Sequence, residues 1–188
     1  MSRTDSTKTP VARRAFLIGG AAAALFATPA APAVLRRAGE FRSLALVNHR
    51  TAEKLRTAYW VEGEYIPEAL EAINYILRDW RQNEIKQIDL RTVDIMAATH
   101  SLLDTSEPFQ VVSGYRSPKT NAMLRSRSRG VARNSYHTRG MAVDITLDTR
   151  TARQIASAAK SLSAGGVGTY SRSSFAHVDS GPVRDWGR

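Results

Sequence analysis

Short runs of apolar and β-branched residues, separated by turn residues, predict several β-strands along the chain. The run at 43–47 indicates a short buried strand, and residues 55–61 indicate a second strand. A glycine-containing turn at 62–64 then leads the chain back beside that second strand. Further strands are predicted at 110–113, 141–146, 167–170 and 175–178.

Apolar residues spaced three or four positions apart predict helices between these strands. Pro67 begins the first helix, because proline is well tolerated at the first helical position. The apolar face of this helix consists of Leu70, Ile73, Leu77 and Trp80. Asp89 is the expected N-cap of the second helix. The apolar face of the second helix consists of Val93, Met96, His100 and Leu103, so His100 is expected to be a packed residue.

The second half of the chain contains two shorter predicted helices. Ser117-Pro118 caps and begins one that continues to about residue 124, and an arginine-rich polar segment at 125–134 is expected to be a loop. An alanine-rich helix is predicted at 151–162, before the pair Gly165-Gly166. No internal repeat or interdomain linker interrupts the chain. These elements predict one α+β domain with a mainly antiparallel sheet flanked by helices.

The first 33 residues predict a cleaved export signal rather than part of the fold. Paired arginines at 13–14 precede a run of small and apolar residues at 15–27, and Ala-Pro-Ala at 31–33 has the form of a signal-peptidase site. The arginine pair before Phe-Leu resembles a twin-arginine signal. The apolar run is shorter than the roughly 20 residues that cross a bilayer. We therefore expect a domain at 34–188, periplasmic or extracellular, with no stable membrane anchor after cleavage.

The composition narrows the possible partners and the possible chemistry. Hydrophobic residues make up 43% and charged residues 23%, a balance typical of a soluble globular domain. The net charge of +10 suits an anionic partner, and export makes nucleic acid an unsuitable one. The chain has no cysteine, which excludes disulfides, zinc fingers and thiol nucleophiles. Histidine and carboxylate side chains must therefore hold any metal ion.

The chain has four histidines, and two of them occur in patterns that suit metal binding. His137 and Asp144 belong to the pattern S-x-H-x-x-G-x-A-x-D, and His177 lies in a predicted strand downstream. Catalytic zinc uses three protein ligands with nitrogen or oxygen donors. Gly140 and Ala142 would let the backbone approach closely between the first two ligands. By spacing alone, His137 could also be a loop residue and Asp144 a capping residue, since no H-E-x-x-H motif is present.

This pattern resembles the D-Ala-D-Ala metallopeptidase group, whose fold is shared with the Hedgehog signalling domain. The resemblance is closest to the murein endopeptidase K branch and covers nearly all of the chain after residue 33. Its blocks include IPEALEAINYILRDWR, VVSGYRSPKTNAMLRSRSRGVARNSYHTRGMAVDI and GGVGTYSRSSFAHVDSGPVRDW. The resemblance implies an α+β fold and one zinc ion held by His137, Asp144 and His177. It also implies hydrolysis of cross-links between the stem peptides of peptidoglycan.

The resemblance assigns further roles and leaves one of them open. Many relatives place the general base three residues before the last ligand, where this chain has Ser174, which cannot serve. Asp179 is the alternative base, because residues two apart on a strand point to the same side. Asp179 could instead orient a ligand histidine, and we prefer the base. Arg116 matches an arginine that faces the substrate carbonyl or carboxylate in relatives, where it could stabilise a developing oxyanion.

Several other polar and aromatic residues are weaker candidates. Ser135 and Tyr115 could form hydrogen bonds with the substrate. Trp186 could flank the cleft or close the core, and we prefer the core. Five arginines surround the first ligand, and they could be a solvated face or could attract the carboxylates of stem peptides. These arginines are Arg125, Arg127, Arg129, Arg133 and Arg139.

Three alternatives to a cross-link endopeptidase follow from the same residues. A carboxypeptidase or dipeptidase that trims a terminal D-amino acid would need a closed pocket with a cation for the free carboxylate. A non-catalytic zinc-binding wall protein would not need Arg116 or a base. A nucleic-acid binder conflicts with the export signal and would need aromatic residues for stacking among the arginines.

Overall fold

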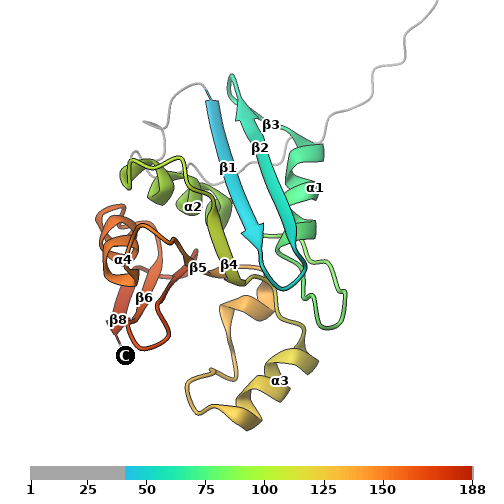
Figure 1. The fold of residues 1–188 in the computed structure, drawn as a ribbon. Helices are drawn as coiled ribbons and strands as arrows, with labels where there is room; N and C mark the ends of the chain where they lie inside the picture. Colours follow the sequence, from blue (N-terminus) through green and yellow to red (C-terminus); the bar gives the residue numbers. More distant parts are fainter. Residues whose placement is uncertain (1–40, 188) are drawn as a thin grey trace, which may run out of the picture.

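The computed structural model describes residues 41–187. The predicted export signal at 1–33 lies outside the described residues. Eight strands form one sheet in the order β3-β2-β1-β4-β5-β7-β6-β8, so the architecture is α+β (Figure 1). The pairs β1/β4 and β6/β8 are parallel, and the other neighbours are antiparallel. The prediction of a mainly antiparallel sheet with flanking helices is therefore confirmed.

The strands and helices follow the predicted order closely. The strands are β1 (Phe41–Asn48), β2 (Glu53–Val61), β3 (Glu64–Tyr65), β4 (Phe109–Ser113), β5 (Ala142–Thr146), β6 (Gly166–Tyr170), β7 (Phe175–Asp179) and β8 (Arg184–Gly187). The α-helices are α1 (Pro67–Ile76), α2 (Leu90–Leu102), α3 (Pro118–Arg127) and α4 (Ala152–Ser161), and η2 (Tyr136–Arg139) is a 3₁₀ helix. None of the helices in the described residues combines the length and apolar character needed to cross a membrane.

The predicted caps begin the helices as expected. The side chains of Asp89 and Ser117 accept hydrogen bonds from the third residue of α2 and α3, at 3.3 Å and 3.2 Å. Thr151 and Gln154 form a reciprocal capping box at the start of α4. These side chains satisfy backbone N–H groups that have no partner within the helix.

The structure corrects two predicted helix ends and adds one strand. Helix α1 ends at Ile76, so Trp80 lies beyond it, 37% exposed, with the Arg81 guanidinium 4.2 Å from its ring centroid. The chain turns there because Asp79 pairs with Glu84 in an isolated β-bridge. Helix α3 continues to Arg127, into the segment expected to be a loop. Strand β8 was not predicted, because its sequence RDWG has no alternation of apolar and polar residues.

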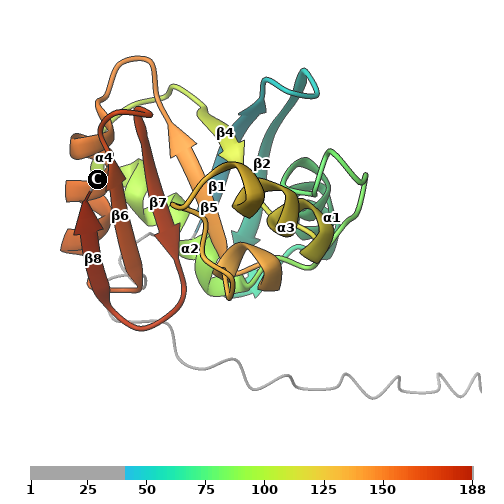
Figure 2. The same ribbon diagram turned by 90° about the horizontal axis from the view of Figure 1, so that it is seen from below.

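The two faces of the sheet have different surroundings in the region of β5, β6 and β7. Helices α2 and α4 pack against each other and against β7, and α1 packs against β1 and β2. Figure 2 shows β6, β7 and β8 side by side, with α4 beside them. Val143, Val167 and Val178 lie opposite one another in the three strands and are buried in the core. Because side chains alternate along a strand, the residues between these valines face away from the core.

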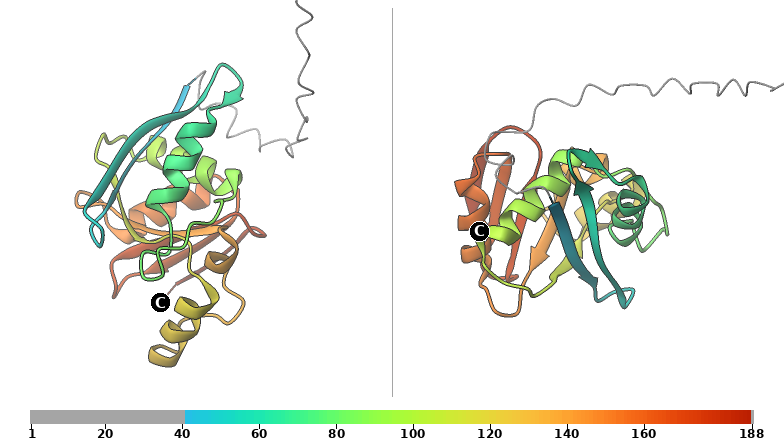
Figure 3. Two further views of the ribbon diagram at one scale, coloured as in Figure 1. Left: turned by 90° about the vertical axis from the view of Figure 1, so that its right-hand side faces the viewer. Right: turned by 90° about the horizontal axis from the view of Figure 1, so that it is seen from above.

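Helix α3 is the element least integrated into the body of the protein. Two views show it projecting from the end of the molecule, away from α1, α2 and α4 (Figures 1 and 3). Only Thr120 and Asn121 of this helix are buried. His100 packs at the edge of the core as expected, with its ring edge-on to Phe109 at a centroid distance of 4.9 Å.

Candidate metal centre

Three side chains from separate elements converge on one point. His137 comes from η2, Asp144 from β5 and His177 from β7, and all three are buried. Oδ1 of Asp144 lies 2.8 Å from Nδ1 of His177 and 3.2 Å from Nε2 of His137. Those two ring nitrogens are 3.2 Å apart. One ligand atom from each residue lies within 4.8 Å of the others, a grouping that could hold a metal ion.

The local sequence brings His137 next to Asp144. Ser135 caps η2 by accepting a hydrogen bond from the His137 N–H at 3.3 Å. Gly140 ends η2 with a φ of +71°, a backbone conformation that residues other than glycine rarely adopt. The chain then enters β5, where Asp144 lies directly opposite His177 in the antiparallel register with β7. The S-x-H-x-x-G-x-A-x-D pattern therefore encodes a 3₁₀ turn, a left-handed glycine and a strand.

Each imidazole is oriented by a hydrogen bond on its outer nitrogen. Nδ1 of His137 lies 2.7 Å from the Gly114 carbonyl oxygen, which can only accept, so Nδ1 carries the proton. Nε2 of His177 lies 3.0 Å from Oδ2 of Asp179 in the same way. The inner nitrogens, Nε2 of His137 and Nδ1 of His177, both face Asp144. This arrangement, in which an outer hydrogen bond fixes the ring that binds the ion, is typical of metal-ligating histidines.

Burial and mutual contacts set the ionisation of the three side chains. Burial lowers the pKa of His137, which is therefore a neutral imidazole at pH 7. Burial raises the pKa of Asp144, but its interactions with His137 and His177 outweigh that effect and keep the pKa well below its usual range. Burial also lowers the pKa of His177, but Asp144 and Asp179 outweigh it and raise the pKa to about 9. A proton and a metal ion therefore compete for Nδ1 of His177.

Asp179 has the surroundings of an orienting residue. Its side chain is 0% exposed and does not line the cleft described below. Besides the His177 ring, it accepts hydrogen bonds from the Gly181 N–H at 2.9 Å and from Arg184 at 3.0 Å and 2.7 Å. Burial raises its pKa, but the hydrogen bonds from His177 and Arg184 outweigh it and lower the pKa to about 2. These contacts favour the second role considered from the sequence, the orientation of a ligand histidine, over the role of general base.

Two rows of residues across the sheet explain how β8 supports the site. In one row, His177 of β7 lies beside Gly168 of β6, and Gly168 lies beside Trp186 of β8. A Cβ atom at residue 168 would lie 2.6 Å from the Trp186 ring, so glycine leaves room for that ring. The Trp186 ring reaches across β6 to a centroid distance of 5.2 Å from the His177 ring.

The second row repeats the arrangement two residues away. Asp179 of β7 lies beside Gly166 of β6, and Gly166 lies beside Arg184 of β8. The guanidinium of Arg184 crosses the glycine and forms two hydrogen bonds with the Asp179 carboxylate. A Cβ atom at residue 166 would lie 2.6 Å from Oδ2 of Asp179. Both long side chains of β8 therefore reach β7 only because β6 carries glycine between them.

A cleft of about 620 Å³ is lined by His137, Asp144 and His177. Arg116 and Ser135, both named as candidates from the sequence, also line it. Trp186 is half-buried and lines it too, so the preference for a core position was wrong. The aromatic residues Tyr136, Tyr170 and Phe175 were not predicted to belong to the site. Tyr170 and Phe175 stack with their ring centroids 4.5 Å apart, and Tyr170 accepts a hydrogen bond from Nε1 of Trp186.

Arg116 is linked to the segment that carries the first metal ligand by two hydrogen bonds. Its backbone N–H donates to the His137 carbonyl at 3.2 Å, and Nη2 donates to the Ser135 hydroxyl at 3.4 Å. Its Nε is buried without a hydrogen-bond partner among the described residues. Burial lowers the pKa of Arg116, the charge of Asp144 opposes that effect, and a guanidinium stays protonated in proteins. A positive charge with donor capacity to spare therefore faces the cleft.

Tyr115 is the candidate that the structure does not bring to the site. It is 4% exposed, does not line the cleft, and its hydroxyl donates to Oε1 of Glu84 at 2.6 Å. Tyr115 and Arg116 are consecutive residues whose side chains take different directions. Arg184 was missed by the sequence analysis, although the spacing G-x-G, H-x-D and R-x-W in three successive segments is a signal that could have found it.

Comparison with known proteins gives one consistent family. A family profile described as peptidoglycan L,D-endopeptidase MepK matches residues 36–186. Peptidoglycan L,D-endopeptidase MepK of Escherichia coli (strain K12) is 43% identical over 176 residues, which cover 93% of this chain and 96% of that protein. A probable peptidoglycan L,D-endopeptidase MepK of Haemophilus influenzae is 35% identical over 187 residues, covering 99% and 98%. The chain therefore belongs to the peptidoglycan L,D-endopeptidase MepK family of metallopeptidases.

Proposed function

We propose that this protein is a zinc-dependent endopeptidase that hydrolyses peptide cross-links in peptidoglycan, with an L,D link as the bond that is cut. The observation that carries the proposal is the convergence of His137, Asp144 and His177 in a cleft that Arg116 also lines. The names of the relatives supply the substrate and the type of bond.

The donor set fits zinc. Two imidazole nitrogens and one carboxylate oxygen are ligands that catalytic zinc takes from proteins. With only three protein ligands, the fourth coordination position stays open for water or substrate. A zinc ion held by these residues would supply Lewis-acid chemistry, polarising the scissile carbonyl and making a water molecule acidic near neutral pH. The orientation of the two rings by Gly114 and Asp179 fits the same use.

The remaining residues of the cleft would bind and orient the peptide. Arg116 would donate to the carbonyl oxygen as negative charge develops there, and its partial burial reduces the screening of that interaction by water. Ser135 holds Arg116 through its hydroxyl and caps η2 at the same time. Asp179 and Arg184 would keep Nδ1 of His177 directed at the ion. The Trp186 ring would cover one side of His177 and limit the access of water to it.

The place of action follows from the substrate. Because peptidoglycan lies outside the cytoplasmic membrane, we expect the protein in the periplasm or outside the cell. Residues 1–33 would serve as a twin-arginine export signal, since an enzyme that acts on peptidoglycan as the relatives do must leave the cytoplasm.

Replacing the arginines at 13–14 by lysines is expected to keep the protein in the cytoplasm, which fractionation of cells would measure. Export unaffected by this change would contradict the twin-arginine route and leave the proposed activity standing.

A digest of purified cross-linked muropeptides tests the proposed activity. The protein is incubated with muropeptide dimers of defined linkage, with and without added zinc, beside a His177→Ala variant, and products are identified by mass. We expect the unchanged protein to convert L,D-linked dimers to monomers only when zinc is present. The His177→Ala variant should leave the dimers intact. Release of single D-alanine would indicate a carboxypeptidase instead. Intact dimers in the presence of bound zinc would indicate a non-catalytic zinc-binding wall protein.

A further inference from the structure

The segment at 117–134, which we call the basic lobe, carries positive charge without any negative charge. It consists of Ser117, helix α3 and the loop that follows, and its sequence contains no aspartate or glutamate. The five cations of the lobe are Lys119, Arg125, Arg127, Arg129 and Arg133. All five are exposed. Within residues 41–187, none of them has an ion-pair partner within 4.0 Å.

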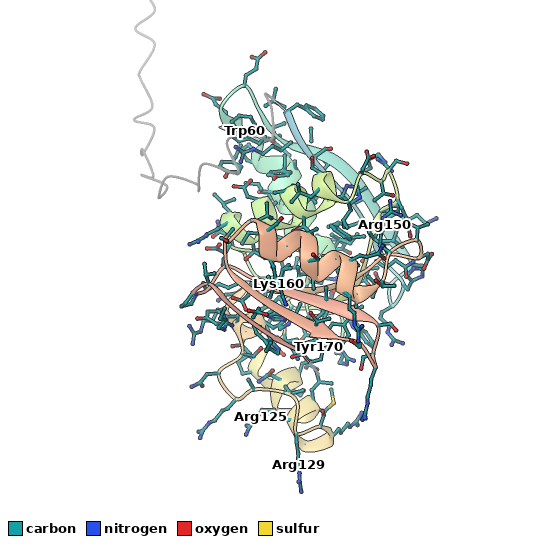
Figure 4. The ribbon with its side chains drawn as sticks, turned by 90° about the vertical axis from the view of Figure 1, so that its left-hand side faces the viewer. Trp60, Arg125, Arg129, Arg150, Lys160 and Tyr170 are labelled. Carbon is teal, nitrogen blue, oxygen red and sulfur yellow. The ribbon has the colours of Figure 1, made fainter. Side chains whose placement is uncertain are left out.

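The fold presents these charges away from the body of the protein. Helix α3 projects from the end of the molecule, and Figure 4 shows Arg125 and Arg129 extending from that end. The side-chain amide of Asn121 donates to the Ala132 and Arg133 carbonyl oxygens at 3.1 Å and 3.4 Å, which folds the loop back onto the helix. The lobe is therefore one ordered unit rather than a helix and a separate loop.

The stability of the helix accounts for only part of this charge. Arg125 and Arg127 lie in the last turn of α3, where a cation interacts favourably with the helix dipole. Lys119 is in the first turn of the same helix, where a cation is unfavourable. Arg129 and Arg133 lie beyond the helix. Like charges held close together repel one another, so this arrangement favours an external anion.

The positive charge continues from the lobe into the catalytic cleft. Ser128, Arg129 and Gly130 of the lobe line the cleft together with the metal ligands. Three further arginines line the cleft, and the one acidic side chain in its lining is the ligand Asp144. These arginines are Arg116, Arg172 and Arg184. An anionic polymer with one part in the cleft would therefore have its adjoining part next to the lobe.

We propose that the basic lobe is a docking surface for carboxylate groups of peptidoglycan stem peptides that adjoin the cross-link bound in the cleft. This inference rests on the proposed function, because stem peptides are repeated along the wall polymer and carry free carboxylates. A membrane surface is the other anionic partner available to an exported protein. The lobe offers it no anchor: the large exposed apolar side chains of the described residues all lie outside 117–134.

A sacculus-binding experiment distinguishes the contribution of the basic lobe from that of the cleft. The full chain is compared with an Arg125→Gln, Arg127→Gln, Arg133→Gln variant, whose three positions are exposed and do not line the cleft. The matched control, Arg50→Gln, Arg91→Gln, Arg153→Gln, removes the same charge from exposed positions outside the lobe. Binding to purified sacculi is measured by sedimentation at 4 °C over a salt series, and again with sacculi whose carboxylates have been amidated.

We expect the lobe variant to bind sacculi roughly ten-fold more weakly at low salt, because three small exposed contacts are lost together. The control variant is expected to bind as the unchanged chain does, and amidated sacculi should bind all three proteins equally weakly. The difference between variants should shrink as salt is added, since the Debye length falls to about 8 Å at physiological ionic strength. The decrease in sacculus binding should exceed any decrease in kcat on a soluble dimer.

Three outcomes would overturn the proposal. An equal decrease in sacculus binding for the lobe variant and the control variant would show a non-specific effect of net charge. Unchanged binding to amidated sacculi would exclude carboxylates as the ligand. Binding to phosphatidylglycerol vesicles that depends on the lobe, with no lobe-dependent binding to sacculi, would assign the surface to the membrane. Failure of the proposed function would show differently, as intact soluble dimers in the digest with the unchanged chain.

Discussion

At the scale of single residues, the hydrogen bonds around His177 distinguish two roles for Asp179. A general base must present a free oxygen to a water molecule beside the scissile bond. Asp179 instead accepts hydrogen bonds from His177, Arg184 and the Gly181 N–H, and it has no exposed surface. We therefore infer that Asp179 orients His177, and the zinc affinity of a variant tests this role.

Asp179→Asn is expected to weaken zinc binding by roughly 10- to 100-fold, as loss of an orienting partner does in other metal sites. The amide cannot accept from both Nε2 of His177 and the guanidinium of Arg184 as the carboxylate does. Competition with a chromogenic chelator measures the affinity. Unchanged zinc affinity with a large loss of kcat would restore the role of base.

Arg116→Gln is expected to lower kcat on a soluble cross-linked dimer by roughly 100-fold or more, because one donor to a developing oxyanion has an effect of that size. Zinc affinity should stay unchanged, since Arg116 contacts Ser135 and the His137 backbone rather than a ligand side chain. Arg91→Gln, an exposed position on α2, is the control. A rise in KM with unchanged kcat would indicate simple substrate binding instead.

At the scale of elements, strand β8 matters because its side chains cross β6. Gly166 and Gly168 make this possible, and both strands hold their parallel register over four residue pairs. A glycine in a strand normally weakens it. Here each glycine faces a longer side chain that contacts β7, so the glycine positions serve the metal centre.

Gly168→Ala is expected to destabilise the protein by about 1–3 kcal/mol, because the added methyl group overlaps the Trp186 ring. Gly187→Ala is the matched control in the neighbouring strand, since a Cβ there would lie 3.9 Å from the nearest atom. Urea unfolding of both variants measures the difference. Equal midpoints for the two variants would show that the Trp186 ring is not held against Gly168.

The segment after α1 is joined to the start of α3 by Asp79. Its carboxylate accepts from the Ser117 N–H at 2.9 Å and from the Arg81 N–H at 3.0 Å. Burial raises the pKa of Asp79, but the hydrogen bonds donated to the carboxylate outweigh it and the net shift is downward. A lowered folded-state pKa means that Asp79 stabilises the fold above its unfolded pKa of about 3.9, and that this contribution is lost as the pH falls through the folded value.

Asp79→Asn is therefore expected to lower the free energy of unfolding by about 1–3 kcal/mol at pH 7, because a buried N–H loses its acceptor. The difference from the unchanged protein should begin to decrease below about pH 4, because the unfolded state then binds a proton that the folded Asp79 does not yet bind. Asp148→Asn at an exposed position is the control. Unfolding curves between pH 3 and 7 measure both, and a difference that stays constant with pH would contradict the assigned shift.

At the scale of the whole molecule, the metal centre ties η2 to the β5/β7 pair, so a bound ion is expected to stabilise the fold. Zinc at 100 times its dissociation constant adds about 2.7 kcal/mol to the free energy of unfolding. That corresponds to roughly 5–10 °C in Tm for a domain of this size. A chelator should reverse the change, and a His137→Ala variant should not respond to zinc. A variant that responds as strongly as the unchanged chain would place the ion elsewhere.

The linear pattern of residues determined most of the elements and the types of side chain in the site. Caps such as Asp89 and Ser117 and the apolar stripe of α2 are local features, and the structure contains them where they were predicted. The pattern S-x-H-x-x-G-x-A-x-D is also local, because a short turn and a left-handed glycine bring His137 to Asp144. Cysteine-free composition confined any metal site to histidine and carboxylate ligands.

Only the tertiary structure decided what depends on pairing between distant strands. The register of β5, β7, β6 and β8 places Arg184 beside Asp179 and Trp186 beside His177, across glycines that have no visible function in the sequence. The same packing turns Tyr115 to Glu84 while Arg116 enters the cleft. Sequence specifies which side chains a strand carries, but the partner strands and their register decide which of them meet.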